Sequence, residues 1–184
     1  MKILCVFLAA ALLVAAGCAP PPSGTGVALR APDVRYDPSA PAVVAAMIRL
    51  ARVAPGDVVF DLGCGDGRIV IAALLSGAAR GVCVDIDPQR IAEARDNAGR
   101  AGVTARIEFR NEDLFATDIR DASVVMLFLW PEVNLKLRPR LARELASGAR
   151  VVSHWHDMGD WPPGETLSVT DGGRTRPLYL WRIP

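Results

Sequence analysis

Three glycines that alternate with small residues form the stretch of this chain best suited to bind a small molecule. They are Gly63, Gly65 and Gly67, and they follow an apolar, β-branched run that ends in Asp61 and Leu62. An apolar helical run begins directly after them, so the pattern predicts a strand, a tight loop and a helix. Glycines in such a loop let the backbone approach a nucleoside-like ligand without interference from Cβ atoms.

The spacing of the glycines distinguishes between nucleoside cofactors. A dinucleotide fingerprint has glycines at its first, third and sixth positions, but here the sixth position is Arg68, which disfavours NAD. The pattern Asp-Leu-Gly-x-Gly-x-Gly resembles motif I of the class I S-adenosylmethionine (SAM) methyltransferases. The resemblance implies that this loop, with Cys64 in it, carries the methionine and sulfonium of SAM. It also implies that Asp61 helps to hold the amino acid end.

A second acid follows the next predicted strand, Gly81 to Asp85. An acid at the end of the second strand of a βαβ unit can accept hydrogen bonds from both ribose hydroxyls. We therefore predict that Asp85 binds the ribose of the cofactor. Asp87 precedes Pro88 and is expected to cap the following helix, while the exchanged assignment, with Asp87 on the ribose, stays open.

A third acid lies after the third predicted strand, Ala105 to Arg110. In class I methyltransferases an Asp at this place contacts the adenine amino group, and Asp113 matches it. The alternative is a surface acid that caps a turn. We expect Ile86 and Leu114, which neighbour the second and third acids, to contact the cofactor as well.

The remaining elements predict an α/β, Rossmann-like doubly wound fold. Ser39 is expected to cap a first helix, and Ser123 to Leu129 is apolar throughout, as a central parallel strand must be. Two short helices are expected next, the second starting at Pro139. The Asp171-Gly172-Gly173 turn predicts a C-terminal antiparallel hairpin. After a fifth strand from Ala149 to His154, this completes a seven-stranded sheet that is mostly parallel.

The composition indicates one globular domain. The chain has 184 residues, 51% of them hydrophobic and 22% charged, with a net charge of +1. This length suffices for one domain with a substantial core. No global positive field attracts nucleic acid, and we expect no nucleic-acid partner.

The N-terminus predicts an address outside the cytoplasm. Lys2 is followed by a short apolar run, so residues 1–17 are expected to be a signal peptide. The run ends in a sequence that resembles a bacterial lipoprotein cleavage box, which implies lipidation of Cys18 and a membrane partner in the cell envelope. Cleavage without lipidation and an uncleaved anchor remain alternatives, as does a cytoplasmic protein whose signal is not used. Residues 18–35, rich in Pro, Gly and Ser, are expected to be a tether, and residues 36–184 the domain.

Two cysteines belong to the expected domain, Cys64 in the glycine loop and Cys83 in the second strand. No Cys-x-x-Cys pair or metal spacing is present, so we interpret them as small buried residues. A disulfide between them is disfavoured because it would crowd the cofactor loop. His154 and His156 share one face of a strand end, but they lack a third ligand at suitable spacing, so no metal is expected.

The run from Tyr36 to Pro184 resembles a group of seven-strand protein lysine methyltransferases that includes archaeal and mitochondrial enzymes. The resemblance rests on the glycine loop, on Tyr-x-Pro-Ser at 36–39, on Pro-Glu-Val-Asn at 131–134 and on Val-Val-Ser-His at 151–154. It implies a SAM-dependent N-methyltransferase that acts on protein lysine. Small-molecule methylation and a catalytically silent, lipid-anchored binding module are the alternatives.

Candidate catalytic residues lie after the fourth strand, at the edge where doubly wound folds bind their ligands. We predict that Trp130 forms a ring wall, Glu132 orients the amine and Asn134 accepts a hydrogen bond. Tyr36 is expected to close over the same site. The alternatives are a core residue for Trp130, a first-turn helix acid for Glu132 and a surface residue for Asn134.

Overall fold

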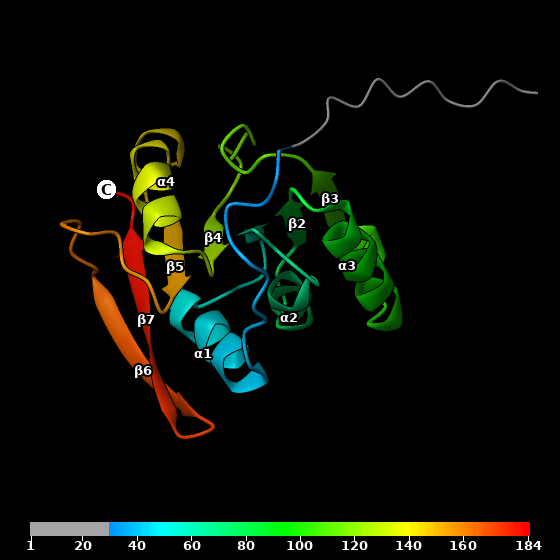
Figure 1. Ribbon diagram of the computed structural model, residues 1–184, viewed down its shortest axis with the longest axis horizontal. Helices are drawn as coiled ribbons and strands as arrows, with labels where there is room; N and C mark the ends of the chain where they lie inside the picture. Colours follow the sequence, from blue (N-terminus) through cyan, green and yellow to red (C-terminus); the bar gives the residue numbers. More distant parts are fainter. Residues whose placement is uncertain (1–29) are drawn as a thin grey trace, which may run out of the picture.

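The computed structural model describes residues 30–184, and a seven-stranded sheet forms its centre (Figure 1). The strands are β1 (Val58–Leu62), β2 (Arg80–Asp85), β3 (Ile107–Asn111), β4 (Val124–Leu127), β5 (Arg150–His154), β6 (Glu165–Asp171) and β7 (Arg174–Arg182). The helices are α1 (Pro41–Ala51), α2 (Arg68–Leu75), α3 (Pro88–Arg100) and α4 (Pro131–Glu144), with a 3-10 turn, η1, at Thr104–Arg106.

The strand order is β3-β2-β1-β4-β5-β7-β6. The first five strands are parallel, and β7 is antiparallel to both β5 and β6. The chain builds outward from β1 to β3 and then returns to add β4 on the other side of β1, so the crevice between β1 and β4 is the topological switch point. The predicted doubly wound, seven-stranded sheet with an antiparallel C-terminal hairpin is confirmed.

The sheet is covered on both faces. One hydrophobic core joins α1, α2 and α3 to one face, and a second joins α4 to the other. All four residues of β4 are buried, as expected of a central strand whose two faces are both covered. The carboxyl ends of β1, β2 and β4 are therefore fixed by rigid packing, which positions the residues that follow them.

Helix α4 is continuous, so the prediction of two short helices was wrong. Pro139 lies inside it, although a proline removes one backbone hydrogen bond from a helix interior. Its ring is exposed, whereas Leu137 and Leu141 on either side of it are fully buried. The burial of these leucines holds the helix together through the proline.

Helix α1 begins without a side-chain cap, so the assignment of Ser39 as N-cap was also wrong. The N-cap residue is Ala40, and Pro41 follows at the first helical position, where its missing N–H needs no partner. Ser39 is buried instead, and its hydroxyl lies 3.0 Å from Nδ1 of His154 at the end of β5. This contact ties the segment before α1 to the edge of the sheet.

The segment before α1 lies on the domain. Val34 packs against the second hydrophobic core, so residues 30–35, expected to belong to a tether, contact the folded unit. The expected signal peptide, Cys18 and residues 18–29 of the tether lie outside the described part of the chain. Within residues 30–184 no helix has the length and apolar character needed to cross a membrane.

Candidate active site

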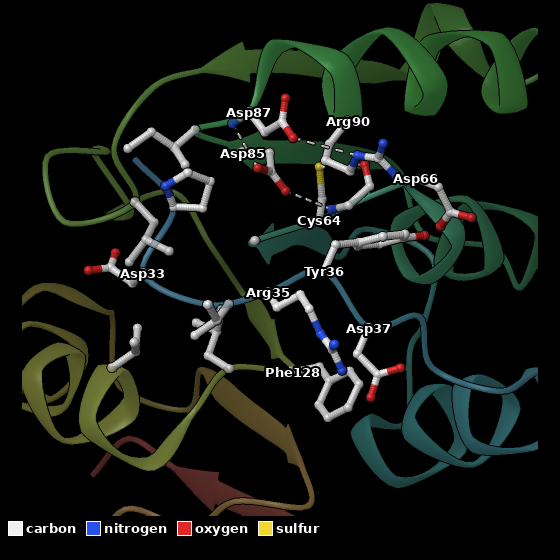
Figure 2. A pocket seen from close by; sticks show the side chains of 18 of the residues that line it. Asp33, Arg35, Tyr36, Asp37, Cys64, Asp66, Asp85, Asp87, Arg90 and Phe128 are labelled. Atoms are coloured by element: carbon white, nitrogen blue, oxygen red, sulfur yellow. Dashed lines mark hydrogen bonds and ion pairs between the residues drawn. The ribbon is translucent and has the colours of Figure 1, made fainter. Parts of the chain in front are cut away.

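A cavity with a volume of about 110 Å³ lies at the carboxyl edge of the sheet, beside the switch point (Figure 2). Its walls come from the loop after β1, the end of β2, the loop after β3, the end of β4 and residues 30–39. Open α/β sheets bind ligands at this place because the connections that follow the two neighbouring strands run in opposite directions there and leave a crevice. Three of its walls carry the acids or glycines identified from the sequence.

The glycine loop adopts a conformation that other residues rarely take. Gly63, Gly65 and Gly67 have φ values of 78°, 54° and 78°, in the left-handed region that glycine enters without strain. A Cβ on Gly65 would lie 2.4 Å from the ring of Tyr36, and one on Gly67 would lie 2.9 Å from Ala94 of α3. Gly63 and Gly65 line the cavity, whereas Gly67 packs against α3 at the start of α2.

Asp61 lies beneath this loop and not on the cavity wall. Its side chain is almost fully buried and accepts a hydrogen bond from the backbone N–H of Val70 at 3.3 Å. Burial raises the pKa of Asp61 to about 8, and the nearby carboxylates of Asp85 and Asp66 add to the shift. Asp61 is not among the residues that line the cavity, and its expected contact with the amino acid end of the cofactor stays a prediction.

Asp85 faces the cavity from the end of β2. Its two carboxylate oxygens accept backbone N–H bonds from Gly65 at 2.9 Å and from Asp87 at 3.0 Å. Burial raises the pKa of Asp85, although these hydrogen bonds act in the opposite direction. Asp87 accepts a bond from the N–H of Gln89 at 2.8 Å and caps α3, so its predicted capping role is confirmed. Ile86 also lines the cavity.

Asp113 lies across the cavity, with Leu114 beside it. Burial opposes ionisation of Asp113, but Arg30 and the N–H of Phe115 hold its pKa below the usual value. Arg30 donates to Asp113 at 2.8 and 3.1 Å and to Asp33 at 2.6 Å. Arg30 thus binds the carboxylate that the resemblance assigns to the adenine amino group.

Residues 30–39 form a segment, here called the strap, across the mouth of the cavity. Figure 2 shows three residues of the strap, Arg35, Tyr36 and Asp37. The ring of Tyr36 lies against Gly65, and the guanidinium of Arg90 lies 4.6 Å from the ring centroid. The expected position of Tyr36, over the site, agrees with this arrangement.

Cys64 and Cys83 form a disulfide, so the expectation of two free cysteines was wrong. The N–H groups of Gly63 and Cys64 both donate to the carbonyl of Val84, at 2.8 and 3.0 Å. These bonds hold the loop against β2 and bring the two cysteines within 5.3 Å at Cα. Both residues are buried, and Cys64 also lines the cavity, so the bridge lies next to the cofactor site.

The three candidate catalytic residues lie near the cavity but do not line it. Trp130 and Glu132 are exposed at the start of α4. Asn134 is fully buried, and its Nδ2 donates to the Ser153 hydroxyl and to the carbonyl oxygens of His156 and Asp157. Asn134 therefore braces α4 against the loop after β5 through Nδ2. Its Oδ1, the predicted acceptor, is buried and has no hydrogen-bond partner among the described residues, so its catalytic role stays a prediction.

His154 is also buried at this edge. Its ring lies 3.9 Å from that of Phe128, which lines the cavity. Burial, together with the charge of Arg176, lowers the pKa of His154 to about 4. No cluster of three or more potential metal ligands occurs among residues 30–184.

Several residues of this edge escaped the sequence analysis, among them Arg30, Asp37, Arg90, Phe128 and Trp155. Phe128 was within a predicted strand, and its position at the carboxyl end was the one available signal. Arg30 and Asp37 reach the site through folding of the strap, Trp155 through the loop after β5 and Arg90 from α3, and no spacing rule predicts these positions.

A switch-point cavity with a glycine loop and an acid at the end of β2 defines the chain as a class I SAM-dependent methyltransferase. The family model for the ANTKMT methyltransferase domain matches residues 61–165, and the chain belongs to this family. S-adenosylmethionine is its cofactor.

Named relatives include protein-lysine methyltransferases. The chain is 42% identical to a protein-lysine N-methyltransferase of Saccharolobus islandicus over 153 residues, which are 83% of this chain and 95% of the relative. It is 39% identical to the mouse adenine nucleotide translocase lysine N-methyltransferase over 117 residues, or 64% of this chain and 51% of the relative.

A solved structure is also similar. It is an RNA methyltransferase from Salinibacter ruber in complex with S-adenosyl-L-homocysteine. The sequences are 49% identical, the TM-score is 0.75, and the match covers 80% of this chain and 94% of that one.

Proposed function

We propose that this protein transfers a methyl group from SAM to the side-chain amine of lysine in a protein substrate. The observation that carries the proposal is the similarity to the Saccharolobus protein-lysine N-methyltransferase over nearly the whole of that relative. The cofactor supplies a methyl group on a sulfonium, which is a good leaving group. The protein contributes mainly by positioning and desolvation.

The cavity residues divide this work. Asp85 is placed to accept hydrogen bonds from the ribose hydroxyls, and Asp113 to accept one from the adenine amino group once Arg30 releases it. An amine must be neutral to attack, and apolar walls favour the neutral form because they desolvate the charged one. Phe128 and Leu129 supply such walls at the end of β4.

RNA and small molecules are the competing substrates, and the Salinibacter structure is named for RNA. Affinity for RNA depends mainly on cations that neutralise phosphates. Two exposed acids at the site, Glu132 in the first turn of α4 and Asp37 on the cavity wall, would instead repel a phosphate backbone and attract an ammonium group. This favours lysine.

The cofactor site is tested by calorimetric titration of S-adenosylhomocysteine into the purified domain, residues 30–184. Asp85→Ala is expected to weaken binding by more than about tenfold, since a buried carboxylate that accepts hydrogen bonds from a ligand contributes on the order of 1.5–3 kcal/mol. Asp121→Ala, at an exposed acid far from the cavity, is the matched control. Equal affinities for wild type and Asp85→Ala would contradict the assignment.

The substrate is tested with radiolabelled SAM, a bacterial envelope protein extract and total RNA. Transfer to protein that disappears after chemical acetylation of the lysines is the expected result. Transfer to RNA alone would contradict the proposal of a lysine substrate and favour RNA. If the domain binds SAM but transfers no methyl group, the catalytically silent binding module is favoured.

We further propose that the protein acts in the cell envelope, with a lipid on Cys18. Two features support this: the apolar N-terminal run that ends before Cys18, and the Cys64–Cys83 disulfide, since disulfides persist in oxidising compartments. Radiolabelled palmitate is expected to label the full chain expressed in a bacterium, and Cys18→Ala is expected to abolish the label. Retention of unlabelled wild-type protein in the cytoplasm would contradict this address.

A further inference from the structure

We infer that an acidic and aromatic rim, formed by Asp37, Trp130, Glu132, Trp155 and Asp157, is the docking surface for a lysine-bearing polypeptide segment. The inference rests on the proposed function and deepens it, because it names how the substrate amine is recognised before it enters the cavity. The chemistry it fits is an ammonium group on a long apolar stem.

The first observation is where large apolar side chains remain exposed. Within residues 30–184, Trp130 is 54% exposed, Trp155 is 40% exposed and Tyr36 is 39% exposed. These three are the aromatic ones, and they belong to segments at the carboxyl edge of the sheet, whereas the other exposed large apolar side chains, Leu75, Leu135 and Leu167, lie on α2, α4 and β6. Exposed apolar side chains gathered at one place mark interaction sites, whereas single scattered ones carry no such meaning.

The second observation is that the two tryptophans belong to one surface. Strands β4 and β5 are paired in parallel register, with Leu127 opposite Ser153. One residue further along, the rings of Phe128 and His154 are in contact. Trp155 follows directly on β5, and Trp130 lies three residues after the end of β4, as the N-cap residue of α4, so both tryptophans leave the same edge of the sheet from neighbouring strands.

The third observation is that Trp155 is held at the surface by its surroundings. Its φ is 70°, a strained value for a residue with a large side chain. Its N–H donates to the carbonyl of Pro177 at 2.8 Å, and its ring stacks on that of His156 with 5.9 Å between centroids. Backbone strain of this kind is retained where the surrounding structure fixes it. The guanidinium of Arg176 lies 5.5 Å from the centroid of the Trp155 ring, which shows that this ring binds a cation, and the rest of the ring remains exposed.

The fourth observation is the charge of the rim. Among the described residues, Asp37, Glu132 and Asp157 form no ion pair, whereas the neighbouring Asp160 is paired with Arg138. Arg35 is the one cation of the strap near these acids that has no ion-pair partner within the described chain. Three carboxylates beside two tryptophan faces are suited to bind an ammonium group, through charge and through cation–π attraction.

The brace described for Asn134 completes the surface. Its Nδ2 binds the carbonyls of His156 and Asp157, which fixes the loop after β5 against the first turn of α4. Glu132 and Asp157 are thereby kept on the same side of the cavity, and the negative charge of Glu132 acts on His156. A lysine that lies between the tryptophans can extend toward Phe128 and the cofactor.

The test measures binding directly, in the presence of S-adenosylhomocysteine. The probe is a fluorescein-labelled, ten-residue peptide of Ala, Gly and Ser with one central lysine, and its twin carries norleucine at that position. Fluorescence anisotropy is expected to show lysine-peptide binding that is at least about tenfold tighter than that of the twin. Trp130→Ala and Trp155→Ala are each expected to weaken it by about threefold to tenfold, and Glu132→Gln to weaken it and flatten its salt dependence.

Leu75→Ala is the matched control, since Leu75 is 64% exposed on α2, away from the rim. Its peptide affinity should equal that of the wild type, and all four variants should bind S-adenosylhomocysteine normally. Unchanged binding by both tryptophan variants, equal binding of the norleucine twin, or no binding by the wild-type domain at millimolar peptide would each overturn the inference. Tryptophan-dependent binding to anionic phospholipid vesicles, with no preference for lysine over norleucine, would overturn it in favour of a membrane surface.

The two proposals fail in different ways. If the rim binds the lysine peptide but no lysine is methylated, the proposed activity is contradicted and the docking surface is supported. If lysine is methylated and both tryptophan variants have the KM and kcat of the wild type, the docking surface is contradicted and the activity is supported.

Discussion

Burial of the Asp61 side chain beneath the glycine loop makes the stability of the fold depend on pH. Its folded-state pKa is raised from 3.8 to about 8, mainly by burial, so the folded protein holds a proton that the unfolded chain releases near pH 4. Such a group contributes stability that is fully present below about pH 4 and is lost as pH rises toward 8. The neutral carboxyl accepts the N–H of Val70 at the start of α2.

Asp61→Asn is therefore expected to keep the fold and to lose part of this pH dependence, because an amide copies the shape of a neutral carboxyl. Urea unfolding at pH 5.5 and pH 8.5 measures it: the wild type should lose more stability between the two values than the variant. Asp121→Asn, at a highly exposed acid, serves as control and should behave as the wild type. Identical pH profiles for wild type and Asp61→Asn would show that Asp61 is ionised in the fold.

The sequence correctly placed those cavity residues whose position depends only on where a strand ends. Asp85, Asp113 and Gly65 follow predictable strands, so their placement beside one another could be inferred from the parallel sheet. The directions of the Asn134 and Cys64 side chains could not be inferred in this way, because each depends on which neighbouring residues pack against it. Asn134 turns inward to bond the loop after β5, and the sulfur of Cys64 turns under the loop to Cys83.

At the scale of elements, the Cys64–Cys83 disulfide joins the loop after β1 to β2. The two residues are separated by 19 positions, and a bridge that closes a loop of this size stabilises a fold by about 3 kcal/mol, mainly by restricting the unfolded chain. The bridge crosses the connection formed by α2, so it also limits how far the glycine loop can move from Asp85.

The double variant Cys64→Ala, Cys83→Ala is expected to unfold at lower urea concentration, with a loss of about 3 kcal/mol, and to bind S-adenosylhomocysteine more weakly. Wild-type protein unfolded in the presence of a dithiol reductant should show a similar loss. The same reductant should leave the double variant unaffected, which controls for other effects of the reagent. Equal stability of wild type with and without the reductant would mean that the bridge contributes nothing.

The same scale explains where element boundaries could not be predicted. Pro139 is a strong local signal for the end of a helix, yet α4 continues because Leu137 and Leu141 are buried in the second core. Tertiary packing outweighed one lost hydrogen bond. By contrast, the Asp-Gly-Gly turn at 171–173 predicted the hairpin correctly, since both glycines need positive φ values that few other residues tolerate.

At the scale of the whole molecule, the strap and the sheet together determine access to the cofactor site. The cavity measures about 110 Å³, whereas sites for small molecules commonly enclose about 300–1,000 Å³. Residues 30–39 line the cavity and are held by Arg30 on Asp113, by Tyr36 on Gly65 and by Ser39 on His154. Because Arg30 occupies the carboxylate predicted to bind adenine, we expect cofactor binding to shift the outer part of the strap.

Arg30 is the contact of the strap that competes with the cofactor, since it occupies the carboxylate predicted to bind adenine. Arg30→Ala is accordingly expected to tighten S-adenosylhomocysteine binding by about twofold to fivefold, the range set by an exposed ion pair. Calorimetry measures the affinity, and Arg52→Ala, which removes another exposed ion pair, with Glu165, should leave it unchanged. Weaker binding by Arg30→Ala would instead make Arg30 part of the bound site, with the strap closing on the cofactor and not excluding it.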